Sequence, residues 1–286
     1  MIDVLVSGAS GFVGKHLINS LNKSSKFEVL GFTREYGDVS ERSSWQQLPV
    51  AKTVVHLASR TFVPESWKDP HGFYSTNVNG TINALEYCRE NNAELIFTSS
   101  YLYGVPDKLP IDEDAELKAA NPYMFSKKMA EEACRFYSQE FNVPVIILRP
   151  FNVYGLGHNS TFLIPTIVDQ IIDTDDVIVN DLEPKRDYIF IEDLVAAIGC
   201  AIVSKKRSGT YNIATGNSYS VAEIIEIAQT LIGKQVKVTS RNERRPNEIM
   251  DTIADITKAK EELSWSPKWS LEDGIKAILN DRMSNA

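Results

Sequence analysis

The fold is decided by residues 2–14, which read IDVLVSGASGFVG. The apolar run 2–6 is typical of a buried strand, and the apolar stripe between residues 12 and 21 is typical of a helix. Glycines at positions 8, 11 and 14 permit a tight turn and close packing of the helix on the strand. In this order the three parts hold a pyrophosphate on backbone N–H groups at the helix N-terminus. We therefore predict a dinucleotide site, whose contacts in this stretch are Gly8, Gly11, Phe12, Val13 and Gly14.

The end of the second expected strand, 27–32, indicates which dinucleotide is bound. Proteins that bind NAD usually carry Asp or Glu here for the ribose 2′-OH, whereas an arginine accommodates a 2′-phosphate. This chain has Thr33 and Arg34, so we expect NADP(H). NAD(H) stays possible, and an ordinary surface residue is the alternative interpretation of Arg34. Residues 37–39 follow so closely that the next strand is short or missing, and Asp38 and Val39 are expected beside the cofactor.

Strand and helix patterns alternate as far as residue 155, which predicts an α/β fold with a parallel, doubly wound sheet of the Rossmann type. Further strands are expected at 53–59, 94–98 and 143–148, and further helices at 69–90 and 122–141. Ligands bind outside the carboxyl ends of the strands in such sheets. The residues expected there are Leu57, Ala58, Ser59, Ser99, Ser100 and Pro150. His56, in the 53–59 strand, is interpreted as a buried core histidine rather than a catalyst.

The alternation breaks after residue 155. Helices are expected at 161–172, 192–203, 220–232 and 271–280, and strands at 187–191 and 236–239. We interpret this mixture as a smaller, mixed α/β C-terminal lobe, 156–286, that supplies substrate contacts. Residues 185–204 are expected to return to the dinucleotide-binding domain, 1–155, whereas the basic run 205–209 is interpreted as a solvated turn.

Composition and charge exclude several classes of protein. The net charge of −8 and the pI near 5.2 argue against a nucleic-acid or anionic membrane surface. Three widely spaced cysteines without a CxxC pattern indicate reduced thiols, and four histidines without an HExxH pair argue against a metal site. Because neither an apolar run of 18 residues nor a signal peptide is recognisable, we expect a cytoplasmic protein without a membrane span.

Tyr123 and Lys127 form the one Tyr-x-x-x-Lys pair of the chain. Asn121 can cap the helix that begins here, and Pro122 suits its first position. Residues four apart share one face of a helix, and a phenol beside an ammonium can act as an acid/base pair because the positive charge favours the phenolate. The pair alone is no rarer than chance, so its chemistry depends on the glycine loop and the serines described above.

Together these motifs resemble the extended short-chain dehydrogenases/reductases of the NAD(P)-dependent epimerase/dehydratase family, which act on nucleotide sugars. The resemblance covers essentially the whole chain. It rests on Gly8-x-x-Gly11-x-x-Gly14, His56-Leu57-Ala58, Ser99-Ser100 with Tyr103-Gly104, Tyr123-x-x-x-Lys127, Arg149-Pro150-x-Asn152-x-Tyr154-Gly155, Arg186-Asp187-Tyr188-Ile189 with Glu192-Asp193, Arg245-Pro246-Asn247-Glu248 and Trp265-Ser266-Pro267.

The resemblance implies a role for each matching residue. Tyr123 would exchange a proton with a sugar oxygen, Lys127 would lower its pKa and hold the nicotinamide ribose, and Ser99 would hydrogen-bond the same sugar oxygen. The expected substrate contacts are Ser100, Asn152, Arg186, Arg245 and Glu248. Arginine suits the diphosphate because its planar fork binds phosphate oxygens in pairs. Family members pair through helices that correspond to residues 69–90 and 122–141, so a homodimer is expected.

Departures from the family pattern narrow the expected reaction. Family 4,6-dehydratases carry acidic residues where Ser100 and Tyr101 stand here, so dehydration is not expected. Epimerase-reductases of the GDP-fucose pathway carry a Cys at the position of Tyr101, so 3,5-epimerisation is not expected either. We expect an NADP(H)-dependent 4-ketoreductase of a nucleoside-diphosphate 4-keto-6-deoxyhexose. The alternatives are an NAD-dependent nucleotide-sugar 4-epimerase and a catalytically silent NADP-binding regulator.

Overall fold

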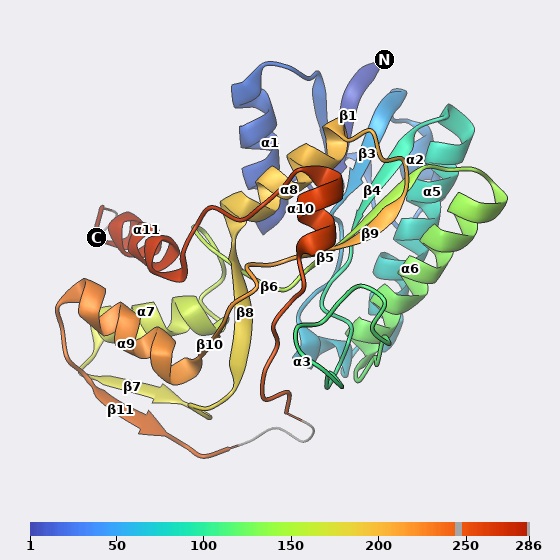
Figure 1. The fold of residues 1–286 in the computed structure, drawn as a ribbon. Helices are drawn as coiled ribbons and strands as arrows, with labels where there is room; N and C mark the ends of the chain where they lie inside the picture. Colours follow the sequence, from blue (N-terminus) through green and yellow to red (C-terminus); the bar gives the residue numbers. More distant parts are fainter. Residues whose placement is uncertain (244–247, 285–286) are drawn as a thin grey trace.

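The computed structural model describes residues 1–243 and 248–284. Six parallel strands form its central sheet (Figure 1). The strand order is β2-β1-β3-β4-β5-β9, and every neighbouring pair is parallel. The strands are β1 (Ile2–Ser7), β2 (Val29–Phe32), β3 (Ala51–His56), β4 (Glu94–Thr98), β5 (Val145–Pro150) and β9 (Gly209–Ile213). The predicted doubly wound, Rossmann-type sheet is confirmed.

The chain changes direction across the sheet at β1. From β1 it goes first to β2 on one side, and then returns through a 3₁₀ turn (Arg34–Tyr36) and α2 (Arg42–Gln46) to β3 on the other side. Only β2 therefore lies on that side of β1. This agrees with the expectation that the strand after β2 is short or missing, which was based on how closely residues 37–39 follow β2. Ligands of open α/β sheets bind where the strand order reverses, which here is the crevice at the carboxyl ends of β1 and β3.

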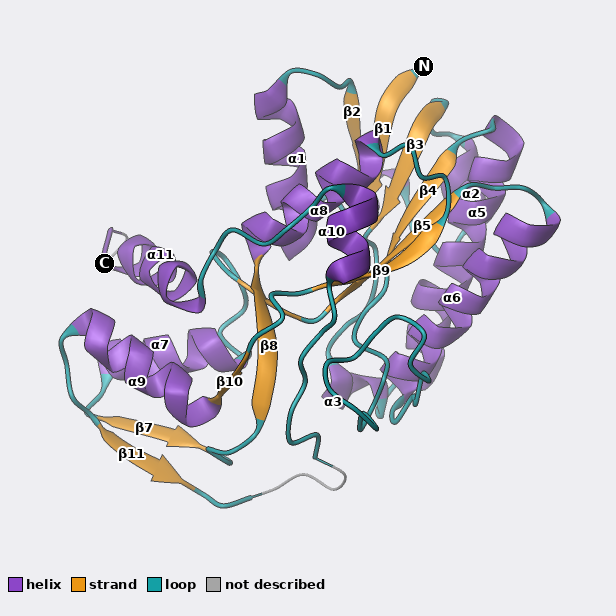
Figure 2. Ribbon diagram, viewed as in Figure 1, coloured by secondary structure: helices purple, strands orange, loops and turns teal. Residues whose placement is uncertain are grey.

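Helices cover both faces of the sheet (Figure 2). Side chains alternate along β1, so that Val4 and Val6 pack toward one face and Leu5 toward the other. The first face is covered by α1 (Phe12–Ser24), α8 (Ile191–Val203) and α10 (Thr257–Leu263), and the second by α5 (Gly80–Asn91) and α6 (Pro122–Glu140). The helix expected at 69–90 is instead divided into α4 (Pro70–Tyr74), a π-helical turn (Ser75–Asn79) and α5, and α3 (Val63–Ser66) precedes it.

The smaller, mixed lobe lies beyond the carboxyl ends of the strands (Figure 1). Its three-stranded sheet has the order β10-β8-β6, and a separate parallel pair joins β7 and β11. Its elements are β6 (Asn152–Tyr154), α7 (Leu163–Asp173), β7 (Asp176–Val179), β8 (Lys185–Phe190), β10 (Ser218–Ser220), α9 (Val221–Ile232), β11 (Lys237–Ser240) and α11 (Leu271–Ser284). Both α8 and β9 lie with the main sheet, because α8 packs on α1 and β9 pairs with β5.

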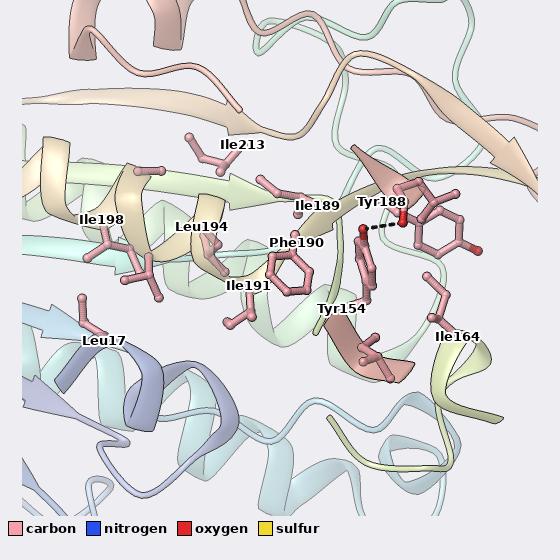
Figure 3. Close-up of a cluster of buried hydrophobic side chains, with 14 of the residues drawn as sticks. Leu17, Tyr154, Ile164, Tyr188, Ile189, Phe190, Ile191, Leu194, Ile198 and Ile213 are labelled. Carbon is pink, nitrogen blue, oxygen red and sulfur yellow. Dashed lines mark hydrogen bonds between the residues drawn. The ribbon is translucent and has the colours of Figure 1, made fainter. Parts of the chain in front are cut away.

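One hydrophobic core joins the main sheet to the lobe. The cluster begins between α1 and α8 and continues along β8 to α7 (Figure 3). Its labelled members are Leu17, Tyr154, Ile164, Tyr188, Ile189, Phe190, Ile191, Leu194, Ile198 and Ile213. None of the helices in the described part of the chain is long and apolar enough to cross a membrane.

Two buried carboxylates anchor the returning chain. Asp187 accepts hydrogen bonds from the N–H groups of Thr215, Gly216 and Ala254, at 2.8, 2.9 and 3.2 Å. Asp193 accepts hydrogen bonds from the N–H groups of Lys268 and Trp269, at 2.9 and 3.0 Å. Buried charges of this kind are stable only when their oxygens are hydrogen-bonded. The aspartates of the Arg186-Asp187 and Glu192-Asp193 motifs therefore have a structural role.

Candidate active site

The glycine loop has the shape that a dinucleotide requires. Gly8 has a φ of +71°, and a Cβ there would lie 2.7 Å from the Ala58 nitrogen. A Cβ on Gly14 would lie 2.2 Å from the Gly8 oxygen, so the helix approaches the loop more closely than a larger residue would allow. Gly11 is the N-cap of α1 and supplies no side-chain cap, and the first turn carries no acidic residue. The first N–H groups of α1 can therefore receive a pyrophosphate, and the residues present fit the cofactor.

The carboxyl end of β2 is followed by a cation, Arg34, and by an exposed carboxylate, Glu35. Arg34 is exposed in the 3₁₀ turn that follows Thr33. Asp38 lies close by, but its Oδ1 accepts hydrogen bonds from the backbone N–H and the hydroxyl of Ser40, both at 2.8 Å. These hydrogen bonds and the charge of Arg34 lower the pKa of Asp38. Val39 packs against the start of α5, where a Cβ on Gly80 would lie 3.1 Å from its Cγ2.

A buried asparagine that the sequence analysis did not single out ties the β3 loop to α6. Asn77 Oδ1 accepts hydrogen bonds from the Ser59 hydroxyl and the Arg60 N–H, at 3.0 and 2.9 Å. Its Nδ2 donates to Ser126 Oγ at 2.8 Å, and Ser126 donates to the Tyr123 carbonyl oxygen at 2.7 Å. Asn77 lies in the π-helical turn, and such turns occur often at functional sites. Its position within the helix expected at 69–90 gave no signal of this role in the sequence.

His56 is part of the core, as interpreted from the sequence. It is buried, and its Nδ1 lies 2.7 Å from Ser7 Oγ at the end of β1. Burial, with a smaller contribution from the charge of Lys127, lowers the pKa of His56 to about 3. The ring is therefore neutral at physiological pH and joins β1 to β3 below the crevice.

Tyr123 and Lys127 lie at the start of α6, beside the end of β4. Asn121 Oδ1 accepts a hydrogen bond from the Met124 N–H at 2.9 Å, and Pro122 is the first helical residue, so the helix begins as expected. Lys127 Nζ donates to the Thr98 carbonyl at 2.6 Å, and burial lowers its pKa to about 8. Burial raises the pKa of Tyr123. The expected lowering by Lys127 is not found in this structure, where burial and the Ser100 hydroxyl are the influences on the pKa of the phenol.

The two serines after β4 face different partners. Ser100 is half-buried, and its hydroxyl lies beside the Tyr123 phenol and opposes the effect of burial on the pKa of that phenol. Ser99 is buried, and its Oγ lies beside the Glu131 carboxylate without the geometry of a full hydrogen bond. The structure thus brings Ser100 to Tyr123, whereas the sequence analysis assigned the catalytic hydroxyl to Ser99. The next residue, Tyr101, donates its phenolic hydrogen to the Gly104 carbonyl at 2.5 Å.

The expected substrate residues lie on the lobe side of the crevice. Arg186 Nη2 pairs with Glu248 Oε1 at 2.5 Å, and its Nη1 donates to the carbonyl oxygens of Lys185 and Ile249. The positive charge of Arg186 also acts on Tyr101, so this arginine lies near the end of β4. Asn152 Nδ2 donates to the Asp187 carbonyl at 3.2 Å.

Arg245, the remaining expected diphosphate contact, lies outside the described residues. Pro150 ends β5 and is paired with Ile213 of β9. Leu57, Ala58 and Ser59 follow β3, at the crevice predicted for the cofactor.

A glycine loop at the reversal point of a parallel sheet, with a Tyr–Lys pair beside the end of β4, defines a dinucleotide-binding protein of the short-chain dehydrogenase/reductase class. The model of the NAD dependent epimerase/dehydratase family matches residues 4–214. The chain belongs to this family, as the motifs of its sequence predicted.

Known relatives match the chain over nearly its whole length. It is 33% identical to the GDP-6-deoxy-D-talose 4-dehydrogenase of Aggregatibacter actinomycetemcomitans, over 99% of this chain and 97% of the relative. It is 31% identical to the UDP-glucose 4-epimerase of Lactobacillus helveticus, over 96% of this chain and 94% of the relative. The structure of RMD from Pseudomonas aeruginosa complexed with NADPH has a TM-score of 0.92 and 26% identity, with 100% of both chains covered.

Proposed function

We propose that this protein is an NADP(H)-dependent 4-ketoreductase of a nucleoside-diphosphate 4-keto-6-deoxyhexose. The observation that carries the proposal is the end of β2, where Arg34 is exposed and the nearby Asp38 carboxylate is bound by Ser40. An arginine at this position suits a ribose 2′-phosphate, and a reductase must exchange its cofactor at each turnover. The resemblance to a 6-deoxyhexose 4-dehydrogenase and to a structure that holds NADPH supports the same choice.

The residues divide into three groups with different tasks. The cofactor would be held by the glycine loop, the β2 end, the β3 end and the β5 end, and when bound it supplies the hydride. The cofactor contacts are Gly8, Gly11, Phe12, Val13, Gly14, Arg34, Asp38, Val39, Leu57, Ala58, Ser59, Tyr123, Lys127 and Pro150. Tyr123 would protonate the sugar oxygen, Lys127 would hold the ribose hydroxyls, and Ser99 or Ser100 would hydrogen-bond the same sugar oxygen.

The second acid/base group that a dehydration would need is missing from the end of β4. Ser100 and Tyr101 stand there, and the Tyr101 phenol donates its hydrogen to the Gly104 carbonyl. Burial also raises the pKa of Tyr101 far above its usual range, so the phenolate is inaccessible as a base. Asn152, Arg186 and Arg245 would contact the nucleoside diphosphate, and Ser100 and Glu248 are the further proposed substrate contacts. Reduction without elimination is therefore the reaction that these residues support.

The test is NADPH oxidation against 4-keto-6-deoxyhexoses carried on dTDP, GDP, UDP and CDP. We expect turnover with at least one of them, and a loss of about 10²–10⁴-fold in kcat/KM for Tyr123→Phe, because a positioned general acid contributes that much. Tyr137→Phe, on the same helix, is the matched control. Failure of the whole panel to oxidise NADPH would contradict the proposal.

A 4-epimerase with tightly held NAD is the second candidate. It is favoured by the similarity to the Lactobacillus helveticus UDP-glucose 4-epimerase and by the same Tyr–Lys pair. An epimerase regenerates its cofactor in each cycle and can keep it bound. Denaturing the purified protein and identifying what it releases separates the two candidates, since stoichiometric NAD would exclude the reductase.

We infer that the protein forms a homodimer through α6. Phe125, Met129 and Phe136 are 48%, 40% and 55% exposed, and their spacing of four and seven residues places them along one outward stripe of the helix. Contiguous exposed apolar surface of this kind is typical of interaction sites. The stripe lies on the helix at which family members are expected to pair.

A further inference from the structure

Glu131 and Arg149 form a buried ion pair that the proposed chemistry does not use. The Glu131 side chain is 0% exposed and that of Arg149 is 2% exposed. Arg149 Nε donates to Glu131 Oε1 at 3.0 Å, and its Nη2 donates to Oε2 at 2.7 Å. Arg135 donates to the same Oε2 at 2.6 Å. A buried pair requires this bidentate geometry to offset the loss of hydration, so the carboxylate is held in one position.

The pair lies directly behind the candidate active site. Glu131 follows Lys127 by four residues, so both side chains leave the same face of α6. Lys127 Nζ donates to the carbonyl oxygen of Thr98, the last residue of β4. The next residue, Ser99, places its buried Oγ beside the Glu131 carboxylate. One carboxylate thus lies next to the lysine and the serine that the sequence analysis assigned to catalysis.

Arg149 also binds the segment that follows β4, and through it β9. Its Nη1 donates to the Tyr103 hydroxyl and to the Glu113 carbonyl oxygen, both at 2.9 Å. The Tyr103 hydroxyl donates to Asn212 Oδ1 at 2.6 Å, and Glu113 Oε1 accepts the Asn212 N–H at 2.8 Å. These hydrogen bonds join Glu131 of α6, through Arg149, to Tyr103 of the segment after β4 and to Asn212 of β9, and Ser99 of the same segment lies beside the Glu131 carboxylate. Networks of this kind rigidify a structure when every member is satisfied.

We propose that Glu131 is a positioning residue of the active site, whose carboxylate, held by Arg149, fixes Lys127 and residues 99–104 relative to each other. The inference rests on the proposed use of Lys127 as the cofactor-holding cation. Glu131 also supplies a negative charge near the lysine, and this charge opposes the effect of burial on the lysine pKa.

Other titratable groups face this region from each element packed against it. They are Tyr123, Cys134 and Arg135 on α6, Cys88 on α5, His56 on β3, Arg149 on β5, and Tyr103 and Glu113 in the segment after β4. At pH 7 the carboxylate of Glu131 is an anion on the same face of α6 as Lys127, four residues further along the helix. Removing it should lower the lysine pKa further, so the ammonium would be lost at a lower pH.

The test compares three variants with the wild-type chain. Glu131→Gln leaves Arg149 buried without its anion and is expected to be strongly destabilised. The double variant Glu131→Gln/Arg149→Met removes both charges together, a change that folded proteins often tolerate, so it keeps the proposal testable. Glu132→Gln is the matched control, because Glu132 is an exposed neighbour on the same helix.

The readouts are urea unfolding, the Kd for NADPH by fluorescence titration, and kcat/KM against pH. For a folded double variant we expect weaker NADPH binding, a loss of roughly tenfold to a hundredfold in kcat/KM, and an alkaline limb moved to lower pH. A double variant with wild-type Kd, kcat/KM and pH profile would overturn the proposal and make the pair purely structural. If the wild-type chain reduces no keto sugar, the proposed function fails, whereas the Kd for NADPH still tests Glu131.

Discussion

Lys127 is a residue of the candidate site whose chemistry depends on its surroundings. Burial lowers its pKa from 10.5 to about 8, so the ammonium is lost as the pH rises through this value. We expect kcat/KM to be constant between about pH 6.5 and 7.5 and to fall along a limb with its midpoint near 8. The measurement is the pH profile with saturating and subsaturating NADPH.

The same lysine offers a control through its replacement by another cation. An arginine stays charged throughout this range, so the activity left in Lys127→Arg should lack the alkaline limb. A limb that persists unchanged in this variant would assign it to another group. The sign for stability is opposite to that for activity. A lysine with a lowered folded-state pKa binds fewer protons than the unfolded chain between about pH 8 and 10.5, so its contribution to stability rises with pH there.

Arg34 is the residue on which the proposed preference for NADP(H) depends. If its guanidinium binds a 2′-phosphate, Arg34→Ala should raise the KM for NADPH by about tenfold to a hundredfold, the value of a charge-assisted hydrogen bond. The KM for NADH should change by less than about twofold, because NADH lacks that phosphate. Arg42→Ala, at an exposed arginine paired with Glu90, controls for the loss of surface charge. Equal effects on both cofactors would contradict the assignment.

At the scale of elements, the π-helical turn Ser75–Asn79 carries a buried polar hub. Asn77→Ala would leave the Arg60 N–H without its acceptor and remove the hydrogen bond that Ser126 Oγ accepts from Asn77. We expect a loss of about 2 kcal/mol in the free energy of unfolding, the cost of unsatisfied buried groups, measured by urea denaturation. Asn79→Ala, at an exposed position in the same turn, should change stability by less than about 0.5 kcal/mol. Equal losses in the free energy of unfolding for the two variants would contradict this role of Asn77.

The elements also show what the sequence could predict. Apolar runs and the glycine spacing are local signals, so β1, β3, β4 and the start of α6 could be located from sequence patterns. The strand β9 was missed because its residues, GTYNI, resemble a turn and its partner β5 lies far away in the chain. The divided helix after β3 was also missed, because the turn at Asn77 depends on contacts with residues 60 and 126.

The candidate site shows the same division between local and distant information. Motifs identified Tyr123 and Lys127, because both lie within five residues of each other at a recognisable helix start. Glu131 carried no signal in the sequence, since its importance comes from burial against Arg149, 18 residues away. The different directions of Ser99 and Ser100 likewise follow from the path of the chain after β4 and not from residue type.

The whole molecule should associate through the stripe on α6. Phe136→Glu introduces a charge into this surface and should convert the homodimer to a monomer with the same far-ultraviolet circular dichroism, measured by light scattering. Val203→Glu is the matched control, because Val203 is 68% exposed at the far end of α8. A wild-type chain that is monomeric at working concentration would refute the homodimer.

The core between α1, α8 and α7 has a consequence for protein engineering. Because one apolar cluster includes Leu17 near the N-terminus and Ile164 in the lobe, neither part carries a complete interior of its own. A chimaera that joins the first 155 residues of one relative to the remainder of another would therefore pack core side chains of one parent against core side chains of the other. Crossover points that keep α1, α7 and α8 from a single parent should give folded chimaeras, so that the surface segments around the crevice can be exchanged without disturbing this core.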